Sequence, residues 1–109
     1  MTAYRVVYVA AFQGRRKPIA RELAARAVKL NQFDSQPGQA GFEHDERESG
    51  QEEVYVALRG SGVVRVEGED VPLEPGRYVL VEPEARRQVV AGPEGLSYAV
   101  VGAVVEAGS

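Results

Sequence analysis

The residues best suited to chemistry in this chain lie between positions 43 and 53, where acidic side chains surround the single histidine, His44. The charge of histidine changes near neutral pH, so His44 could act as a general acid or base. When carboxylates are crowded into one site, the pKa of one of them is raised, and a carboxyl group that can be protonated also suits proton transfer. A solvated, charged loop is the alternative interpretation of this run. Its acidic residues are Glu43, Asp45, Glu46, Glu48, Glu52 and Glu53.

Alternation along the next segment indicates which of these side chains can share a site. Residues 53–59 alternate between an apolar set and a second set that includes Glu53 and Tyr55. Successive residues of a strand point to opposite faces, so the two sets meet different environments. In a small barrel one face can join a packed layer while the other lines a cavity. Tyr55 could offer its ring and hydroxyl to a ligand there, or could simply pack in the barrel.

The elements that position these residues are predicted to be mostly strands. From residue 27 onward, short runs of Val, Leu, Tyr and Phe are broken by Gly or Pro at the spacing typical of an all-β sandwich or barrel. A hairpin is predicted over 63–73, with its turn at Gly68. The N-terminal part is predicted to form a strand over 4–11, at a sheet edge or a dimer contact, and one short helix over 18–25.

Length and composition favour one domain, residues 1–109, whose N-terminal strand and helix occupy 4–25. The formal net charge is -3, without the basic face that nucleic acid requires, so we expect no nucleic-acid partner. The basic run at 15–17 is interpreted as a solvated turn. The absence of cysteine excludes disulfides, thiolate metal sites and a cysteine nucleophile. The apolar N-terminal run is too short to span a bilayer, so no membrane partner is expected and a cytoplasmic location is the default.

Two spaced motifs resemble those of the cupin superfamily, small double-stranded β-helix barrels of the jelly-roll kind. The first motif of that family is Gly, five residues, His-x-His, three or four residues, Glu, six residues, Gly. Gly38, His44, Glu46, Glu53 and Gly60 occupy its positions in this chain. A glutamate replaces the second histidine, and the loop before the last glutamate is longer than usual.

The second motif is more degenerate. Gly76 anchors it and Pro83 falls one place late. Counting forward then places Arg87 where the family has a histidine and Ala91 where it has an asparagine. The resemblance covers about residues 27–103 and implies an all-β cupin barrel most similar to small single-domain bacterial cupins with no assigned reaction.

Two details of this alignment have alternatives. A shifted register would place Glu46 and Glu48 at both histidine positions and restore the usual loop length, but it would abandon His44. Of the neighbouring Arg86 and Arg87, only one can point into the barrel. The spacing favours Arg87, and a β-bulge would exchange the two.

The resemblance implies a metal, usually iron, manganese, nickel or zinc, held by three histidines and one glutamate. His44, Glu46 and Glu53 would be the ligands present in this chain. Arg87, at the third histidine position, is always charged and has no lone pair to give, so it would repel a divalent ion and pair with the carboxylates. We therefore expect no cofactor, with a divalent metal on the three remaining ligands as the alternative.

Three functional hypotheses follow. The leading one is a homodimeric cupin that binds a small polar or anionic ligand with His44, Glu46, Glu53, Tyr55 and Arg87, in a metal-free or weakly metal-binding cavity. Arg87 would clamp a carboxylate or phosphate, and His44 and Glu53 would transfer protons, as in metal-independent sugar epimerases of this superfamily. The second is a metal-dependent oxygenase or isomerase. The third is a non-catalytic dimeric sensing or scaffolding module that exchanges its N-terminal strand between subunits.

Overall fold

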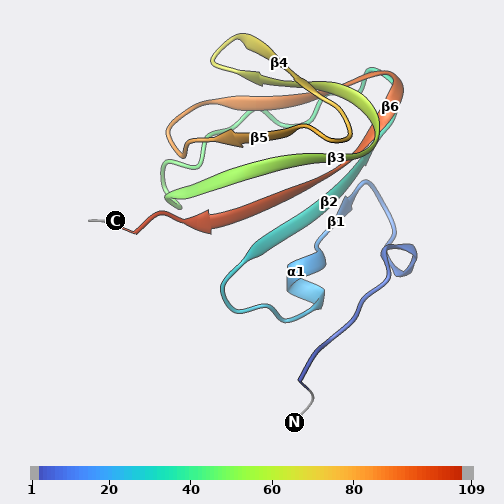
Figure 1. Cartoon of the computed structure of the whole chain (residues 1–109), viewed down its shortest axis with the longest axis vertical. Coiled ribbons are helices and arrows are strands. Elements are labelled where there is room, and N and C mark those ends of the chain that lie inside the picture. Colours follow the sequence, from blue (N-terminus) through green and yellow to red (C-terminus); the bar gives the residue numbers. More distant parts are fainter. Residues whose placement is uncertain (1–2, 107–109) are drawn as a thin grey trace.

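The structure is a computed structural model that describes residues 3–106 (Figure 1). It has an all-β fold with little helix, as the sequence predicts. The N-terminal elements are a 3-10 turn η1 (Val9–Ala11), a short strand β1 (Arg16–Lys17) and a short helix α1 (Ile19–Glu22). The longer strands are β2 (Lys29–Ser35), β3 (Gln51–Val66), β4 (Glu69–Leu73), β5 (Tyr78–Val81) and β6 (Arg87–Val104).

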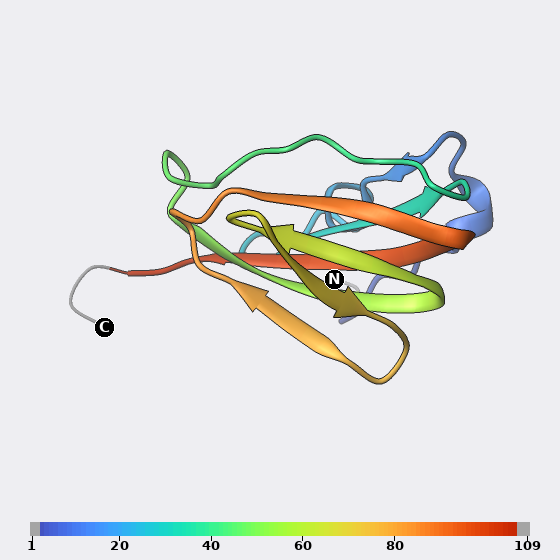
Figure 2. The ribbon, with the colours of Figure 1, turned by 90° about the horizontal axis from the view of Figure 1, so that it is seen from above.

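The strands form one antiparallel sheet in the order β1-β2-β6-β3-β4, and β5 pairs with β3 beside this path. The two longest strands, β3 and β6, pair along most of their length, with register shifts between Ala57 and Arg59 and between Gly60 and Gly62. Such irregularities bend a strand pair. Figures 1 and 2 show the result: β3 and β6 curl over, so that their two halves lie in opposite walls of a barrel.

Glycine at position 62 is required by this bend. A Cβ there would collide with the backbone carbonyl of Val90, which belongs to the paired strand β6. Without a side chain, the two backbones approach closely where the strands turn from one wall into the other.

The hydrophobic core fills the space between the walls. Val64 and Leu73 have no exposed surface, and Val81 has 2%. The ten residues of the cluster are Tyr55, Ala57, Val64, Leu73, Val81, Val89, Ala91, Leu96, Tyr98 and Val100. They come from β3, β4, β5 and β6, so burial of this cluster holds the two walls together.

The hairpin predicted over 63–73 is confirmed. Val66 pairs with Glu69, which leaves a two-residue turn of Glu67 and Gly68. Their φ angles are 49° and 83°. Positive φ at both central residues matches the twist of the flanking strands, and it explains why glycine occupies the second position.

The strand predicted over 4–11 is wrong for the monomer. This segment contains only the turn η1, and Tyr4, Val6 and Tyr8 are 72%, 63% and 76% exposed. A strand needs a neighbour for its backbone groups, and within residues 3–106 none pairs with this segment.

The predicted helix is confirmed but shorter, at Ile19–Glu22 with Pro18 as its N-cap. Neither it nor any other helix among these residues has the length and apolar character to cross a membrane.

The loop of residues 36–50, between β2 and β3, runs beside the first half of β6 and carries part of the site (Figure 2). Two isolated bridges, Ala40 with Val90 and His44 with Arg87, hold it there. The amide of His44 donates to the Arg87 carbonyl over 2.9 Å, and the Arg87 amide donates back to the His44 carbonyl over 2.8 Å. Residues that exchange both hydrogen bonds lie directly opposite each other, so this bridge fixes where His44 enters the barrel.

Candidate functional site

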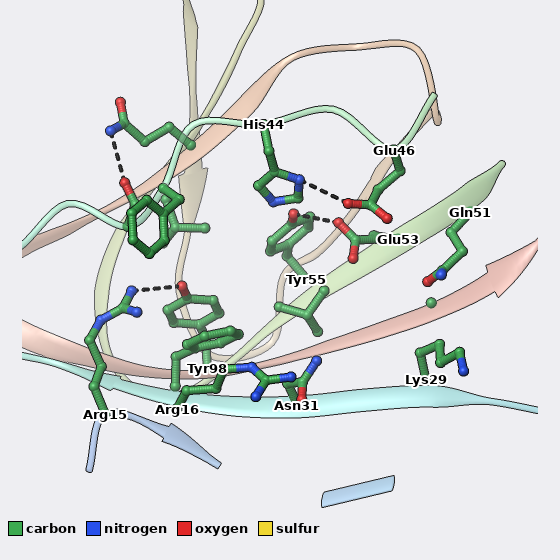
Figure 3. A pocket seen from close by; sticks show the side chains of 17 residues that line it. Arg15, Arg16, Lys29, Asn31, His44, Glu46, Gln51, Glu53, Tyr55 and Tyr98 are labelled. Atoms are coloured by element: carbon green, nitrogen blue, oxygen red, sulfur yellow. Dashed lines mark hydrogen bonds and ion pairs between the residues drawn. The ribbon is translucent and has the colours of Figure 1, made fainter. Parts of the chain in front are cut away.

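A cavity of about 440 Å³ opens inside the barrel between the strands and this loop (Figure 3). One wall comes from β2, the N-terminal half of β3 and the C-terminal half of β6, and the other from residues 41–46 and 88–89. This volume is within the range of small-molecule sites. Its ionisable groups are His44, Glu46 and Glu53 at one end, which we call the acid cluster, and Arg15, Arg16 and Lys29 on the β1–β2 side.

The strand register explains why the cavity is open between these two sets. Gly102 of β6 pairs with Lys29 on β2 and with Glu53 on β3. Two strand spacings separate the backbones of Lys29 and Glu53 by about 10 Å, with no side chain standing between them. A Cβ at position 102 would lie 2.7 Å from Oε1 of Gln51 and 3.5 Å from Cγ of Glu53. Glycine therefore keeps the cavity floor free.

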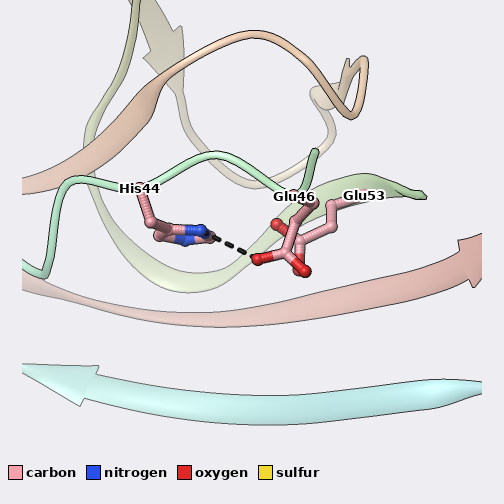
Figure 4. A group of neighbouring side chains, drawn as sticks. All are labelled: His44, Glu46 and Glu53. Atoms are coloured by element: carbon pink, nitrogen blue, oxygen red, sulfur yellow. Dashed lines mark ion pairs between the residues drawn. The ribbon is translucent and has the colours of Figure 1, made fainter. Parts of the chain in front are cut away.

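The acid cluster is internally connected (Figure 4). Nδ1 of His44 lies 3.0 Å from Oε2 of Glu46, whose Oε1 accepts a 2.8 Å hydrogen bond from Ser49. Tyr55 donates to Oε1 of Glu53 over 2.8 Å. The side chains of His44, Glu46 and Glu53 are 41%, 22% and 14% exposed, so each can still contact a molecule in the cavity.

Tyr55 acts in this cluster as a hydrogen-bond donor. Burial raises the pKa of its hydroxyl, and the negative charge and hydrogen bond of Glu53 raise it further. The positive charge of Arg87 opposes this shift only in part. Tyr55 therefore stays protonated across the physiological range and fixes the orientation of the Glu53 carboxylate.

Aromatic rings form the side of the cavity between its two charged ends. Phe33 and Tyr98 are directly opposite on β2 and β6, and their rings stack with centroids 5.2 Å apart. The Tyr55 ring lies 6.4 Å from that of Tyr98. The guanidinium carbon of Arg15 lies 4.9 Å from the Phe33 ring centroid, at cation–π distance.

The interpretation of 15–17 as a solvated turn is wrong. Arg16 and Lys17 form β1, and Arg15 and Arg16 line the cavity. Lys17 is 8% exposed, with Nζ 2.9 Å from Oδ2 of Asp34. The run is drawn into the fold because β1 pairs with β2, which carries Asp34. Sequence reasoning missed these residues because three cations in a row give no local sign of a partner far along the chain.

Arg87 lies behind the acid cluster and does not line the cavity. Its side chain is 0% exposed, with Nε 3.5 Å from Oε1 of Glu53 and Nη1 donating to the Ala85 carbonyl over 2.7 Å. Arg86 points outward and pairs with Glu43 over 3.1 Å, as the predicted alternation requires. Arg87 can hold Glu53 in place from this position. Its expected role as a direct clamp on a ligand is not supported, because it does not reach the cavity surface.

The other four residues expected to bind a ligand, His44, Glu46, Glu53 and Tyr55, all line the cavity. Glu48 is exposed and does not line it. The geometry thus agrees with the alignment that keeps His44, and the shifted register has no support.

The donor atoms of the acid cluster also fit a divalent cation. One ligand atom from each of His44, Glu46 and Glu53 lies within 4.8 Å of the others. An imidazole with two carboxylates suits iron, manganese or zinc. Arg87 replaces the fourth ligand, and its charge beside Glu53 weakens the attraction for a cation. The residues therefore fit a three-ligand site with lower affinity than a complete set would give.

Comparison with known proteins agrees with this architecture. A family model described as "Cupin domain" matches residues 31–102. A cupin protein from Bacteroides fragilis superposes with a TM-score of 0.83 over 100% of this chain and 89% of its own, at 24% identity. The protein TT1209 from Thermus thermophilus superposes with a TM-score of 0.71 over 82% of this chain and 81% of its own, at 28% identity.

A curated relative matches part of the chain. Dimethylsulfoniopropionate lyase DddW of Ruegeria pomeroyi is 38% identical over 47 residues, which is 43% of this chain and 31% of that protein. This match thus spans about a third of the relative's length. The family model, by contrast, extends from β2 through most of β6 and includes every residue of the acid cluster. On this match and on its fold, the chain belongs to the cupin family.

Proposed function

We propose that this protein binds a small carboxylic acid in the cavity and catalyses proton transfer on it. The observation that carries the proposal is the convergence of an imidazole and two carboxylates on one end of the cavity. His44 is paired with Glu46, and Glu53 with Tyr55, before any ligand enters. Groups held in this way need little reorganisation when a ligand binds, which is what efficient acid–base catalysis requires.

Glu53 is the proposed base. Its Oε1 is held by Tyr55 and faces Arg87, so Oε2 is left for the ligand. It would take a proton from a carbon next to the ligand's carboxylate. His44, supported by Glu46, would return a proton to that carbon in an isomerisation, or give one to a hydroxyl leaving group in an elimination. No electrons are gained or lost in this sequence, so the products are those of an isomerisation or, when a leaving group is present, of an elimination.

A second candidate is a metal-dependent cupin enzyme, which the clustering of three donor atoms within 4.8 Å favours. His44, Glu46 and Glu53 would hold iron, manganese or zinc. Such an ion would supply Lewis-acid chemistry to a bound carboxylate or hydroxyl. Binding of the ion would compete with the His44–Glu46 contact, because Nδ1 of His44 is already 3.0 Å from the carboxylate.

The test is solvent-deuterium incorporation followed by NMR. Protein treated with EDTA is incubated in D2O with 3-hydroxypropionate and with dimethylsulfoniopropionate, the compound in the name of the curated relative. We expect deuterium beside the carboxylate, or an elimination product, with wild-type protein. Glu53→Gln and His44→Gln should lose this activity. Glu48→Gln, an exposed carboxylate outside the cavity, is the matched control and should keep it.

The outcomes separate the candidates. Activity that appears only after Mn²⁺ or Fe²⁺ is added would favour the metal-dependent enzyme. Binding of the acids without exchange or product, with and without metal, would favour the non-catalytic sensing module. Equal activity of the Glu53→Gln and Glu48→Gln variants would contradict the assignment of the base.

We also propose that the protein is a homodimer. The support for this is the exposed apolar segment of Tyr4, Val6 and Tyr8, which has no strand partner within residues 3–106. Figure 1 shows the segment extending away from the barrel, where a second copy could pair with it. An added strand would satisfy its backbone groups and cover its side chains.

A further inference from the structure

We propose that Arg15 is the anion anchor of the cavity and binds the carboxylate of a short-chain acid whose adjacent carbon is turned towards the acid cluster. This inference rests on the proposed function. It adds the orientation of the ligand and names the residue that selects for a negative charge.

The contacts of Arg15 leave its charge without an anionic partner. Its guanidinium lies 4.9 Å from the Phe33 ring centroid, and Nη2 donates a long, 3.4 Å hydrogen bond to the Tyr98 hydroxyl. Its Nε is buried and has no hydrogen-bond partner. None of the ion pairs among residues 3–106 includes Arg15. A guanidinium has five N–H donors, so most of this capacity is free.

The two buried cations among residues 3–106, Lys17 and Arg87, each face a carboxylate of this chain. Lys17 is 2.9 Å from Asp34, and Arg87 is 3.5 Å from Glu53. Buried charges are normally paired, because removing an ion from water without a partner is costly. Arg15 differs from both in lining the cavity, and it is half-buried, whereas the other two cations of the lining, Arg16 and Lys29, are exposed. The anion that completes its environment is therefore expected from the cavity contents.

The loop opposite is shaped to admit this guanidinium. A Cβ at Gly41 would lie only 3.0 Å from Nη2 of Arg15, closer than a side chain comfortably allows. Glycine at this position lets the guanidinium lie directly against the loop. Together with the stacking on Phe33, this holds a long side chain in one orientation, as a preformed binding site requires.

Two neighbouring tyrosines lie between Arg15 and the acid cluster. Arg15 meets the hydroxyl of Tyr98, and Glu53 meets the hydroxyl of Tyr55. The two rings are 6.4 Å apart, so the anchor and the acid cluster lie at the ends of a short aromatic surface. A short-chain acid fits this arrangement. Its planar carboxylate can accept two parallel hydrogen bonds from the planar guanidinium.

The test compares 3-hydroxypropionate with 3-hydroxypropionamide, its neutral counterpart, in NMR titrations at constant ionic strength. Wild-type protein should bind the acid more tightly than the amide. The Arg15→Gln variant loses one charge-assisted pair, so it should bind the acid about 10- to 100-fold more weakly than wild-type protein does. Its affinity for the amide should not change. Arg77→Gln makes the same change of charge at an exposed position outside the cavity and should change neither.

Gly41→Ala provides a second variant that keeps every charge. Its methyl group should displace the Arg15 guanidinium and weaken acid binding, which also covers the case that Arg15→Gln fails to fold. Acid binding by Arg15→Gln equal to that of Arg77→Gln would overturn the inference and leave the proposed function intact. Equal binding of acid and amide by wild-type protein, or tighter binding of inorganic phosphate than of the acid, would also overturn it. The deuterium experiment tests the proposed function separately.

Discussion

Replacing Arg87 with methionine should destabilise the protein strongly, although this residue does not touch the cavity. Its side chain is 0% exposed, and its Nε lies 3.5 Å from Oε1 of Glu53. At an effective dielectric constant of about 20, two unit charges at that separation attract each other by about 5 kcal/mol, much of which the cost of burying them offsets. Removing one partner leaves the other charge buried alone, which typically costs about 3–5 kcal/mol. Because Glu53 retains 14% exposure, we expect about 3 kcal/mol.

Urea unfolding followed by circular dichroism measures this effect in a double-mutant cycle. Arg87→Met, Glu53→Gln and the double variant are compared with wild-type protein. The double variant should be more stable than Arg87→Met alone, with a coupling of about 2 kcal/mol, because it no longer buries an unpaired carboxylate. Arg86→Met is the matched control. Its side chain is 53% exposed, so it should lose no more than about 1 kcal/mol.

Two results would refute this reasoning. One is a loss below about 1 kcal/mol for Arg87→Met, similar to that of the control. The other is additivity of the two single changes, which would show that Arg87 and Glu53 do not stabilise each other in the folded protein.

Three further predictions follow from other parts of the fold. Burial would raise the pKa of Asp34, but hydrogen bonds from Lys17, Ser97 and Gln32 and the charge of Lys17 outweigh this and lower the pKa from 3.8 to about 2. The ionised Asp34 carboxylate thus stabilises the fold above about pH 4 and loses that contribution towards pH 2. Because the side chain is partly exposed, the free energy of unfolding should fall by about 1 kcal/mol over this range. Urea titrations of Asp34→Asn should not show this fall. Gly62→Ala should lower the free energy of unfolding by about 2–3 kcal/mol, because its methyl group meets the Val90 carbonyl. An unchanged urea midpoint would contradict the close approach of β3 and β6 at this bend. Light scattering should find a dimer for wild-type protein and a monomer for Tyr8→Glu, whereas a wild-type monomer would rule out the N-terminal contact.

The part of the site on β3 could be predicted because its signal is local. Strand alternation depends only on the chain itself, so Glu53 and Tyr55 were expected on one face, and both line the cavity. The turn at Gly68 is local in the same sense, because two residues determine its backbone geometry. The motif spacing added His44 and Glu46, which lie on a loop without regular structure.

The N-terminal part could not be predicted in the same way, because its structure depends on distant partners. The β-branched and aromatic residues at 4–11 favour a strand, but no partner for it exists within residues 3–106. Lys17 is buried only because β1 pairs with β2 and brings it to Asp34. No property of a three-residue basic run distinguishes this outcome from a solvated turn.

Dependence on distant partners also explains why Arg15 lines the cavity, whereas the sequence predicted this place for Arg87. Motif spacing gives the strand and face of Arg87, but it does not show that the Glu53 side chain lies between Arg87 and the cavity. Within the acid cluster, Glu46 contacts the imidazole of His44, and the charge of Glu53 is paired with that of Arg87. The positive charges that line the cavity without an ion-pair partner among residues 3–106 are those of Arg15, Arg16 and Lys29, and Arg15 is the least exposed of the three. A chain with a formal net charge of -3 can in this way favour an anion in its interior, because short-range pairing, and not the overall charge, sets the local field.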